Sequence, residues 1–410
     1  MVFSYSLATA SLFLTPTFAF TSTYGRHATL RSETDLHMSA ALIVQNKGGG
    51  HGELGYQLAQ ALSTNEKITS ITILQDDACN DEKEPFKSYE SDLPDVTVVK
   101  ASLSDESMTS TDLQSILGEG KQFDYVWDNA SKGPVGSGKA VCDCAKDWDV
   151  KLFTYVSSAG MYQPGSDATF PMPETTPIKE SAGQAQFDAY AVELGLPLVS
   201  FRPQYIYGEK ANKYDYIDWY FDRLVRELPL PIPGDGSQKV SLTNSKDVAT
   251  LLTAPLNNEE AAIEQRFFNC GTDQLVSYNE VAYMCAEAAG IPKEKVMIEH
   301  YDADLFGKAY FPFRLTDFYV APDTAKDKLN YEGAKNSLSE DLKWYYESYQ
   351  ARGGPTKKME LIKDWEITVG STSRYDIGSI YDKYDPLEVD WSDVQDLNVD
   401  EALVKDSADV

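Results

Sequence analysis

The sequence predicts an α/β fold: a doubly wound parallel sheet with a smaller C-terminal α/β lobe of the substrate-binding type. A short apolar segment, Ala40–Gln45, leads directly into a glycine-rich turn and then into a helical pattern. Further strand-like segments alternate with helical stretches, which is typical of parallel sheets. Apolar residues make up 42% of the 410 residues, enough for a large core. We expect one domain over residues 39–350, with its core at 39–205 and the lobe at 206–350.

The glycine-rich turn follows the first strand and precedes a helix predicted over Glu53–Leu62. It contains both G-x-G-x-x-G and G-x-x-G-x-x-G. Between a strand and a helix, such a turn indicates a Rossmann-type site for NAD(P) or another nucleotide, because the backbone can approach a pyrophosphate at a helix N-terminus. His51, inside the turn, either contacts a phosphate or only fills the loop. The cofactor-binding candidates in the turn are Gly49, Gly50, Gly52 and Gly55.

Two polar residues at strand ends extend this candidate site. Asp76 ends the second strand, about 20 residues after the turn, where an acid binds a ribose hydroxyl in such folds. The alternative is a solvated loop acid in an acidic chain. Asn129 follows the fourth strand, at the carboxyl end of the sheet, where ligands bind. The further strands are predicted at Ile68–Leu74, Val96–Val99, Phe123–Trp127 and Leu152–Ser157.

Composition excludes several classes of protein. Thirty-six basic and 64 acidic residues give a net charge of −28, which counts against a large basic surface for a polyanion. Five cysteines without a C-x-x-C pair and only four histidines argue against a disulfide framework and a zinc site. Asp128, Asp247 and Glu180 are oxygen ligands that suit Mg²⁺, but no spacing singles them out, and the metal site stays unassigned.

The two ends of the chain differ in composition from its centre. Residues 1–19 have the apolar segment and small-residue cleavage point of a signal peptide. Residues 20–38 are rich in Ser and Thr and begin with Phe20, as in a bipartite presequence that directs proteins to the plastid stroma; plain secretion is the alternative. No later segment is apolar for long enough to span a membrane. Residues 351–410 read as an acidic, extended or disordered extension that can dock on the domain.

Several motifs carry a family resemblance. Val156–Tyr162, Phe201–Gly208 and Pro231–Gln238 resemble extended short-chain dehydrogenases of the nucleotide-sugar epimerase group. Ser200–Tyr205 and Trp219–Arg226 are similar, more narrowly, to chloroplast stem-loop-binding proteins. That resemblance implies binding of structured RNA, divalent-metal-dependent endoribonuclease activity on stem-loop or ribosomal RNA, and association with plastid ribosomes. We also expect a homo-oligomer that binds no membrane.

The catalytic residues of the hydride-transferring relatives are missing. Those enzymes use a Ser, a Tyr and a Lys four residues after the Tyr, which lowers the pKa of the phenol. Ser158 lies at the serine position, but Glu180 and Gln184 stand where Tyr and Lys belong. No Tyr-x-x-x-Lys occurs between Tyr155 and Gly208. We therefore expect no dehydrogenase or epimerase activity, although the nucleotide pocket remains.

A helix predicted over Asp218–Leu228 supplies the first RNA-binding candidates. Trp219, Arg223 and Arg226 are spaced to share one face, which could stack a base and hold phosphates. The alternatives are a solvated face, or arginines that once held a nucleotide-sugar diphosphate. Arg202, which we expect to pack under the end of the sheet, and Arg314 are further candidates. Two other functions stay open: an active epimerase or dehydratase, and a non-catalytic nucleotide-binding scaffold, which the acidity favours.

Overall fold

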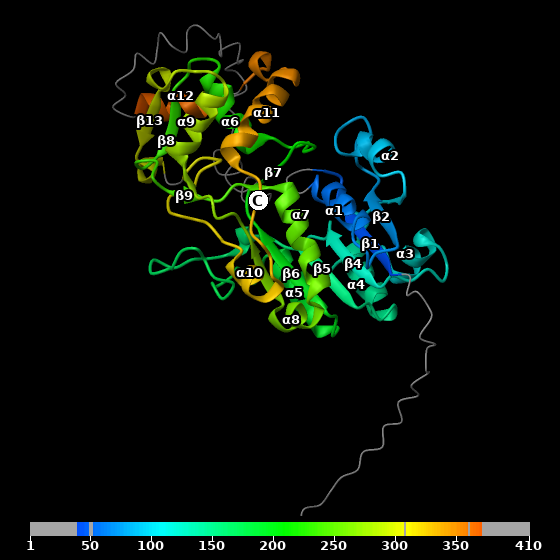
Figure 1. The fold of residues 1–410 in the computed structure, drawn as a ribbon. Coiled ribbons are helices and arrows are strands. Elements are labelled where there is room, and N and C mark those ends of the chain that lie inside the picture. Colours follow the sequence, from blue (N-terminus) through cyan, green and yellow to red (C-terminus); the bar gives the residue numbers. More distant parts are fainter. Residues whose placement is uncertain (1–38, 49–51, 307–308, 360, 371–410) are drawn as a thin grey trace, which may run out of the picture. The chain divides into compact units, whose positions relative to one another are not determined.

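The fold is described from a computed structural model, which describes residues 39–48, 52–306, 309–359 and 361–370 (Figure 1). The predicted signal peptide and transit segment, residues 1–38, lie outside these ranges. So do Gly49, Gly50 and His51 of the glycine turn, and residues 371–410 of the acidic extension.

A parallel sheet of seven strands forms the centre of the fold, in the order β11-β6-β5-β4-β1-β2-β3. The strand order reverses between β1 and β4, and in such sheets ligands bind beyond the carboxyl ends of the strands at that switch point. This arrangement confirms the predicted fold class. The strands are β1 (Ala40–Gln45), β2 (Ser70–Asp76), β3 (Val96–Ala101), β4 (Tyr125–Asn129), β5 (Leu152–Val156), β6 (Leu198–Pro203) and β11 (Phe267–Cys270).

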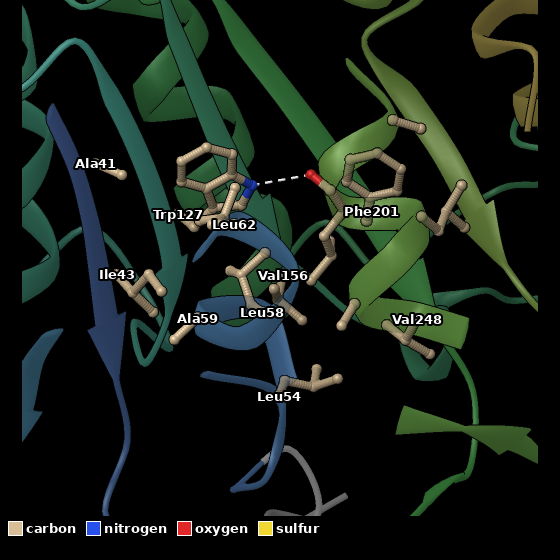
Figure 2. Packing of buried hydrophobic residues seen from close by; sticks show 14 of the residues in the cluster. Ala41, Ile43, Leu54, Leu58, Ala59, Leu62, Trp127, Val156, Phe201 and Val248 are labelled. Carbon is tan, nitrogen blue, oxygen red and sulfur yellow. Dashed lines mark hydrogen bonds between the residues drawn. The ribbon is translucent and has the colours of Figure 1, made fainter. Parts of the chain in front are cut away.

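One face of the sheet is covered by α1 (Leu54–Ser63) and α7 (Ser245–Thr253), which lie side by side (Figure 1). Leu54, Leu58 and Leu62 recur at helical spacing on α1 and are buried against the sheet (Figure 2). The buried indole of Trp127 donates from Nε1 to the Leu252 carbonyl oxygen at 2.9 Å. Burying one leucine side chain contributes about 1.5–3 kcal/mol to stability. The three leucines therefore hold α1 against the sheet, directly after the turn that follows β1.

The opposite face is covered by α3 (Ser110–Leu117), α4 (Gly136–Asp147) and α5 (Gly183–Glu193). Phe187 of α5 packs on Tyr155 of β5, with ring centroids 4.2 Å apart. Both rings are fully buried, which sets α5 firmly on the sheet. Shorter helices in this half are α2 (Tyr89–Asp92), α8 (Glu259–Gln265) and α10 (Asp323–Leu329).

The C-terminal lobe has its own buried cluster, built mainly from α6, α9 and α11. Three two-stranded pairings complete it: β7 with β10, β8 with β13, and β9 with β12. Its helices are α6 (Asp215–Leu224), α9 (Tyr278–Ala288) and α11 (Leu338–Ala351). Its strands are β7 (Ile206–Tyr207), β8 (Leu230–Pro233), β9 (Lys239–Val240), β10 (Thr243–Asn244), β12 (Val276–Ser277) and β13 (Ile298–Tyr301).

The structure corrects the predicted bounds of α6 and the predicted character of the acidic extension. Helix α6 begins at Asp215 and ends at Leu224, three to four residues earlier at each end than predicted. The beginning of the acidic extension is not extended: residues 362–370 form α12 (Ile362–Gly370), which packs against β8 and β13. Within the described ranges, no helix has the length and apolar character that crossing a membrane requires.

Candidate functional site

The glycine turn holds α1 tightly against β1. A Cβ atom added at Gly55 would overlap Oε1 of the buried Gln45 side chain, so this close approach requires glycine. A Cβ atom added at Gly52 would lie 2.7 Å from Cα of Gly48, which is also too close. The N-terminus of α1 has no side-chain cap from Glu53. These are the features that a pyrophosphate site on this turn needs. Gly49 and Gly50 lie outside the described residues.

Amide side chains join the turn to β1 and β4. Gln45 donates from Nε2 to the Gly52 carbonyl oxygen at 2.8 Å, and Asn129 donates from Nδ2 to Gln45 Oε1 at 2.9 Å. Asn46 donates to the Asn129 carbonyl oxygen at 2.8 Å and accepts from the Gly48 backbone at the same distance. Asn129 therefore lies at the carboxyl edge, as predicted, and helps to hold the turn. Sequence reasoning missed Gln45; a polar residue ending an apolar strand just before the turn was the available signal.

Asp76 lies at the end of β2, beside the turn. Its side chain is buried, and Oδ1 accepts from the Ala78 backbone at 3.1 Å. The neighbouring Gln75 donates to the Asn46 carbonyl oxygen at 2.8 Å, which connects this strand end to the glycine turn. The position suits an acid that binds a ribose hydroxyl, and that role stays a prediction.

Glu53 connects the turn to the loop Gly208–Lys213. Its carboxylate accepts from Gln57 Nε2 at 2.6 Å and from the Lys210 backbone N–H at 3.1 Å. Burial raises the pKa of Glu53, although these hydrogen bonds oppose the shift. The side chain of Asn212, in the same loop, lies against Gly48 and Gly52. Glu53 and Asn212 were both missed, and no local sequence signal marks either as part of the site.

The positions that would carry hydride chemistry have other roles. Ser158 Oγ accepts from the Gly160 backbone at 3.0 Å and caps a single turn of 3₁₀ helix. Glu180 is exposed and precedes α5, whereas Gln184 lies in the first turn of that helix. The two residues therefore do not form the pair on one helix that a Tyr and a Lys make in the active relatives.

Tyr162, four residues after Ser158, does not replace the missing phenol. It is buried; its hydroxyl donates to Asn269 Oδ1 at 2.8 Å and accepts from Arg202 at 3.0 Å. Burial raises the pKa of Tyr162 to about 12, although the Arg202 charge opposes this. A phenol that acts as a base near neutral pH needs the opposite shift.

The prediction that α6 presents an RNA-binding face is wrong, because the side chains of Trp219 and Arg223 are buried. Trp219 is 9% exposed and Arg223 is 5% exposed. The Arg223 guanidinium donates from Nε and Nη2 to both carboxylate oxygens of Asp364, at 2.6 and 2.8 Å, and stacks 3.8 Å from the centre of the Trp219 ring. Asp364 belongs to α12, so the beginning of the C-terminal extension covers this face.

Arg226 is buried by the same part of the chain. It donates to the carbonyl oxygens of Gly354 and Lys357, each at 2.9 Å, and to the Tyr349 hydroxyl at 3.3 Å. The residue is 8% exposed, so it cannot reach RNA in this arrangement. Trp219 and Arg223 lie on α6, whereas Arg226 lies two residues beyond its end, so the structure does not give the single helical face that was predicted.

The other two candidate arginines differ from each other. Arg202 is 3% exposed, contacts Tyr162 and the Glu174 carbonyl oxygen, and lies 3.9 Å from the Asp188 carboxylate. It lies near the carboxyl end of β6 and is too buried to reach RNA. Arg314 is half-buried, with its guanidinium 3.7 Å from the centre of the Phe318 ring. Its contact with a phosphate stays a prediction.

The three acids considered for Mg²⁺ do not form a metal site together. Asp128 accepts from the Ala130 and Ser131 backbones, and burial raises its pKa. Asp247 accepts from the backbones of residues 335 and 336, and Glu180 is exposed. In the part of the chain that the structure describes, no three His, Cys, Asp or Glu residues come together as metal ligands.

Comparison with known proteins agrees with this fold. The chain is 31% identical over 220 residues to the chloroplast stem-loop binding protein of 41 kDa b of Arabidopsis thaliana. That match covers 52% of this chain and 56% of the relative, so the chain spans about half the length of the curated protein it matches.

Solved structures of nucleotide-sugar enzymes share the fold. The dTDP-glucose 4,6-dehydratase of Bacillus anthracis, solved with NAD, has a TM-score of 0.58 at 15% identity, covering 76% of this chain and 98% of that one. The UDP-glucuronic acid 4-epimerase of Bacillus cereus, also solved with NAD, has a TM-score of 0.57 at 16% identity, covering 76% and 99%. The model of the NAD dependent epimerase/dehydratase family matches residues 48–271, more than half of the chain. On this match, together with its seven-stranded parallel sheet and glycine turn, the chain belongs to the NAD dependent epimerase/dehydratase family.

Proposed function

We propose that this protein binds stem-loop RNA in the plastid, on a nucleotide-binding fold that has lost hydride chemistry. The observation that carries the proposal is the 31% identity to a protein named for chloroplast stem-loop binding. The site geometry supports the loss of hydride chemistry, since Ser158 caps a turn and Glu180 lies outside α5. The family fold supports nucleotide binding by the glycine turn.

The surface that best suits RNA phosphates is the carboxyl edge of the sheet. Lys47 follows β1, Lys132 follows β4, and Lys179 precedes α5; all three are exposed. The Lys132 carbonyl oxygen packs on Gly183, the first residue of α5, and the Ala182 backbone donates to the Lys179 carbonyl oxygen at 2.9 Å. These contacts bring the loops of Lys132 and Lys179 together.

In the described ranges, the lysines at this edge are not neutralised by neighbouring acids. Among the described residues, the ammonium groups of Lys47, Lys132 and Lys179 have no ion-pair partner, whereas Lys246 and Lys326 pair with acids at 2.6 Å. The N-termini of α4 and α5 also lack side-chain caps and add positive potential. Glu180, next to Lys179, and the net charge of −28 oppose this attraction, so we expect modest affinity at low salt.

Salt-dependent binding tests the proposal. The mature protein should bind a stem-loop RNA at low salt with Mg²⁺ present, with affinity that falls steeply as salt rises. Replacing Lys47, Lys132 and Lys179 by Gln should flatten the slope of log K against log salt by about two units, since each phosphate contact contributes roughly 0.7–0.9. The matched control replaces Lys246, Lys326 and Lys335, which changes the charge equally at lysines already paired with acids.

The results test the RNA-binding function and the proposed binding surface separately. If the wild type does not bind the stem-loop at low salt, the proposed function is wrong. If it binds and the variant at the carboxyl edge binds with the same slope as the control, the surface is wrong, and Arg314 becomes the next candidate. Sedimentation of the same samples tests the expected homo-oligomer.

The family resemblance extends the proposal to a metal-dependent endoribonuclease that associates with plastid ribosomes. Cleavage of the bound stem-loop should require Mg²⁺ and stop when EDTA is added. Co-sedimentation of the protein with plastid ribosomes, lost after RNase treatment, tests the association. RNA that binds and stays intact with Mg²⁺ would leave the protein an RNA-binding protein without nuclease activity.

A further inference from the structure

The loop Gly208–Lys213 joins β7 to α6, and we call it the strap. It crosses the N-terminal end of α1, where the Lys210 backbone donates to Glu53 at 3.1 Å. The Lys210 ammonium group reaches further, to Ser88 Oγ at 2.7 Å and Asp92 at 3.2 Å, in the segment after β2. One loop therefore touches both the start of the first helix and the region beyond the second strand. In this fold a dinucleotide places its pyrophosphate and its ribose at these two places.

The beginning of the strap is pressed against the turn. A Cβ atom added at Gly208 would overlap both Glu53 Oε2 and Ser245 Oγ. Glu53 and Ser245 are buried, so neither can retreat into solvent. Together with the contacts of Lys210, this fit fixes the position of the strap relative to α1.

Asn212 then fills the approach to the turn. The second glycine of G-x-G-x-x-G, Gly52, is the one whose bare backbone lets a pyrophosphate come close. Here a Cβ atom added at Gly52 would lie 3.0 Å from Asn212 Oδ1, and one added at Gly48 would overlap Asn212 Nδ2. The Asn212 side chain lies in the space that both glycines leave open. A pyrophosphate and this amide cannot both occupy that space.

We propose that the strap competes with a dinucleotide for the glycine turn, and that Asn212 is the residue that excludes the pyrophosphate. This inference rests on the proposed nucleotide-binding function of the turn. Gly55 and Asp76 fit a bound dinucleotide, whereas Asn212 does not. Binding therefore requires residues 208–213 to leave α1, which breaks the contacts of Lys210 with Glu53 and Asp92.

The competition lowers the apparent affinity for the nucleotide. A ligand that binds only the open form has its dissociation constant raised by the reciprocal of the open fraction. Removing the Asn212 amide raises that fraction without touching the glycines or Asp76. Opening of the strap also frees the residues that lead into α6, so nucleotide binding is coupled to the C-terminal lobe.

Titration of the full mature protein with NADH and with NADPH, followed by nicotinamide fluorescence, tests the competition. Asn212→Ala and Lys210→Met should each bind at least one of the two about tenfold more tightly than the wild type. Lys213→Met is the matched control, because Lys213 is exposed and, within the described ranges, its ion pair is with the neighbouring Asp215 at 3.4 Å. Hydrogen exchange of residues 208–214, with and without saturating nucleotide, is the second readout. Bound nucleotide should speed exchange there, and Asn212→Ala should do the same without ligand.

Each outcome decides a different question. Nucleotide binding by the wild type that Asn212→Ala leaves unchanged, with no change of exchange in residues 208–214, overturns the strap and leaves the nucleotide site standing. Failure of every variant to bind either nucleotide overturns the nucleotide site itself, and the competition with it. Circular dichroism and thermal unfolding of each variant show whether a loss of binding comes from misfolding.

Discussion

Asp188 should make the protein less stable as the pH rises from about 4 to about 6. This α5 residue is 4% exposed, and burial raises the pKa of its carboxyl from 3.8 to about 6. The Ser200 side chain and the Arg202 guanidinium, which lies 3.9 Å away and too far for a hydrogen bond, offset only part of the burial. The folded protein therefore holds a proton that the unfolded chain releases at lower pH.

The sign and size of the effect follow from this difference. Below pH 3.8 the carboxyl is protonated in both states and costs nothing; above pH 6 a buried carboxylate opposes folding. A pKa raised from 3.8 to about 6 corresponds to a loss of about 3 kcal/mol across that window, at about 1.4 kcal/mol for each pH unit. Asp188→Asn mimics the protonated side chain, so it should remove this dependence and be more stable than the wild type at pH 8.

Urea unfolding of the two proteins at several pH values between 4 and 8 measures the effect. Other buried acids, such as Glu53 and Asp128, also titrate, so the informative quantity is the difference between variant and wild type at each pH. Glu180→Gln, which changes an exposed carboxylate, should follow the wild type. A constant difference between Asp188→Asn and the wild type, or a variant less stable at pH 8, would refute the reasoning.

Three further predictions concern other parts of the chain. Asp364→Ala should lower the free energy of unfolding by about 3–5 kcal/mol, because it leaves the buried Arg223 charge without its partner. Combining Arg223→Met with Asp364→Leu should restore much of this stability. Equal losses in the single and double variants would contradict the prediction. The purified protein should neither oxidise nor epimerise nucleotide sugars with NAD(P), as measured by nicotinamide absorbance and product analysis, and turnover that Ser158→Ala abolishes would show that hydride chemistry survives. Phe20→Ala should block import of a fluorescent fusion into the plastid, and unchanged localisation would argue against the bipartite presequence.

The sheet and the position of the turn could be predicted because their signals are local. Ala40–Gln45 was predicted with the bounds that β1 has, and the fifth strand differs by one residue, because continuous apolar runs between breakers mark buried parallel strands. The turn follows from glycines placed between a strand and a helix. Asn129 was predicted just after the fourth strand, and it is the last residue of β4.

Contacts between distant segments could not be predicted in this way. Arg223 looked like a surface cation because its partner, Asp364, is 141 residues away in a segment without steady periodicity. Asn212 lies 160 residues beyond Gly52, and nothing in its own neighbourhood relates it to the turn. A helical face with an aromatic and two arginines has the same local pattern whether RNA or the chain's own carboxylate pairs with it.

The buried pair between α6 and α12 also determines where the chain can be cut. A fragment that ended at residue 350, where the family-like region was expected to stop, would lose Asp364 and the carbonyl oxygens of residues 354 and 357. The guanidinium groups of Arg223, on α6, and Arg226, just beyond its end, would then lose these partners and form a basic surface. Such a fragment would gain affinity for nucleic acids through a surface that the longer chain buries. Expression for binding studies should therefore keep the chain at least through Gly370, so that any RNA affinity measured belongs to the protein and not to the cut.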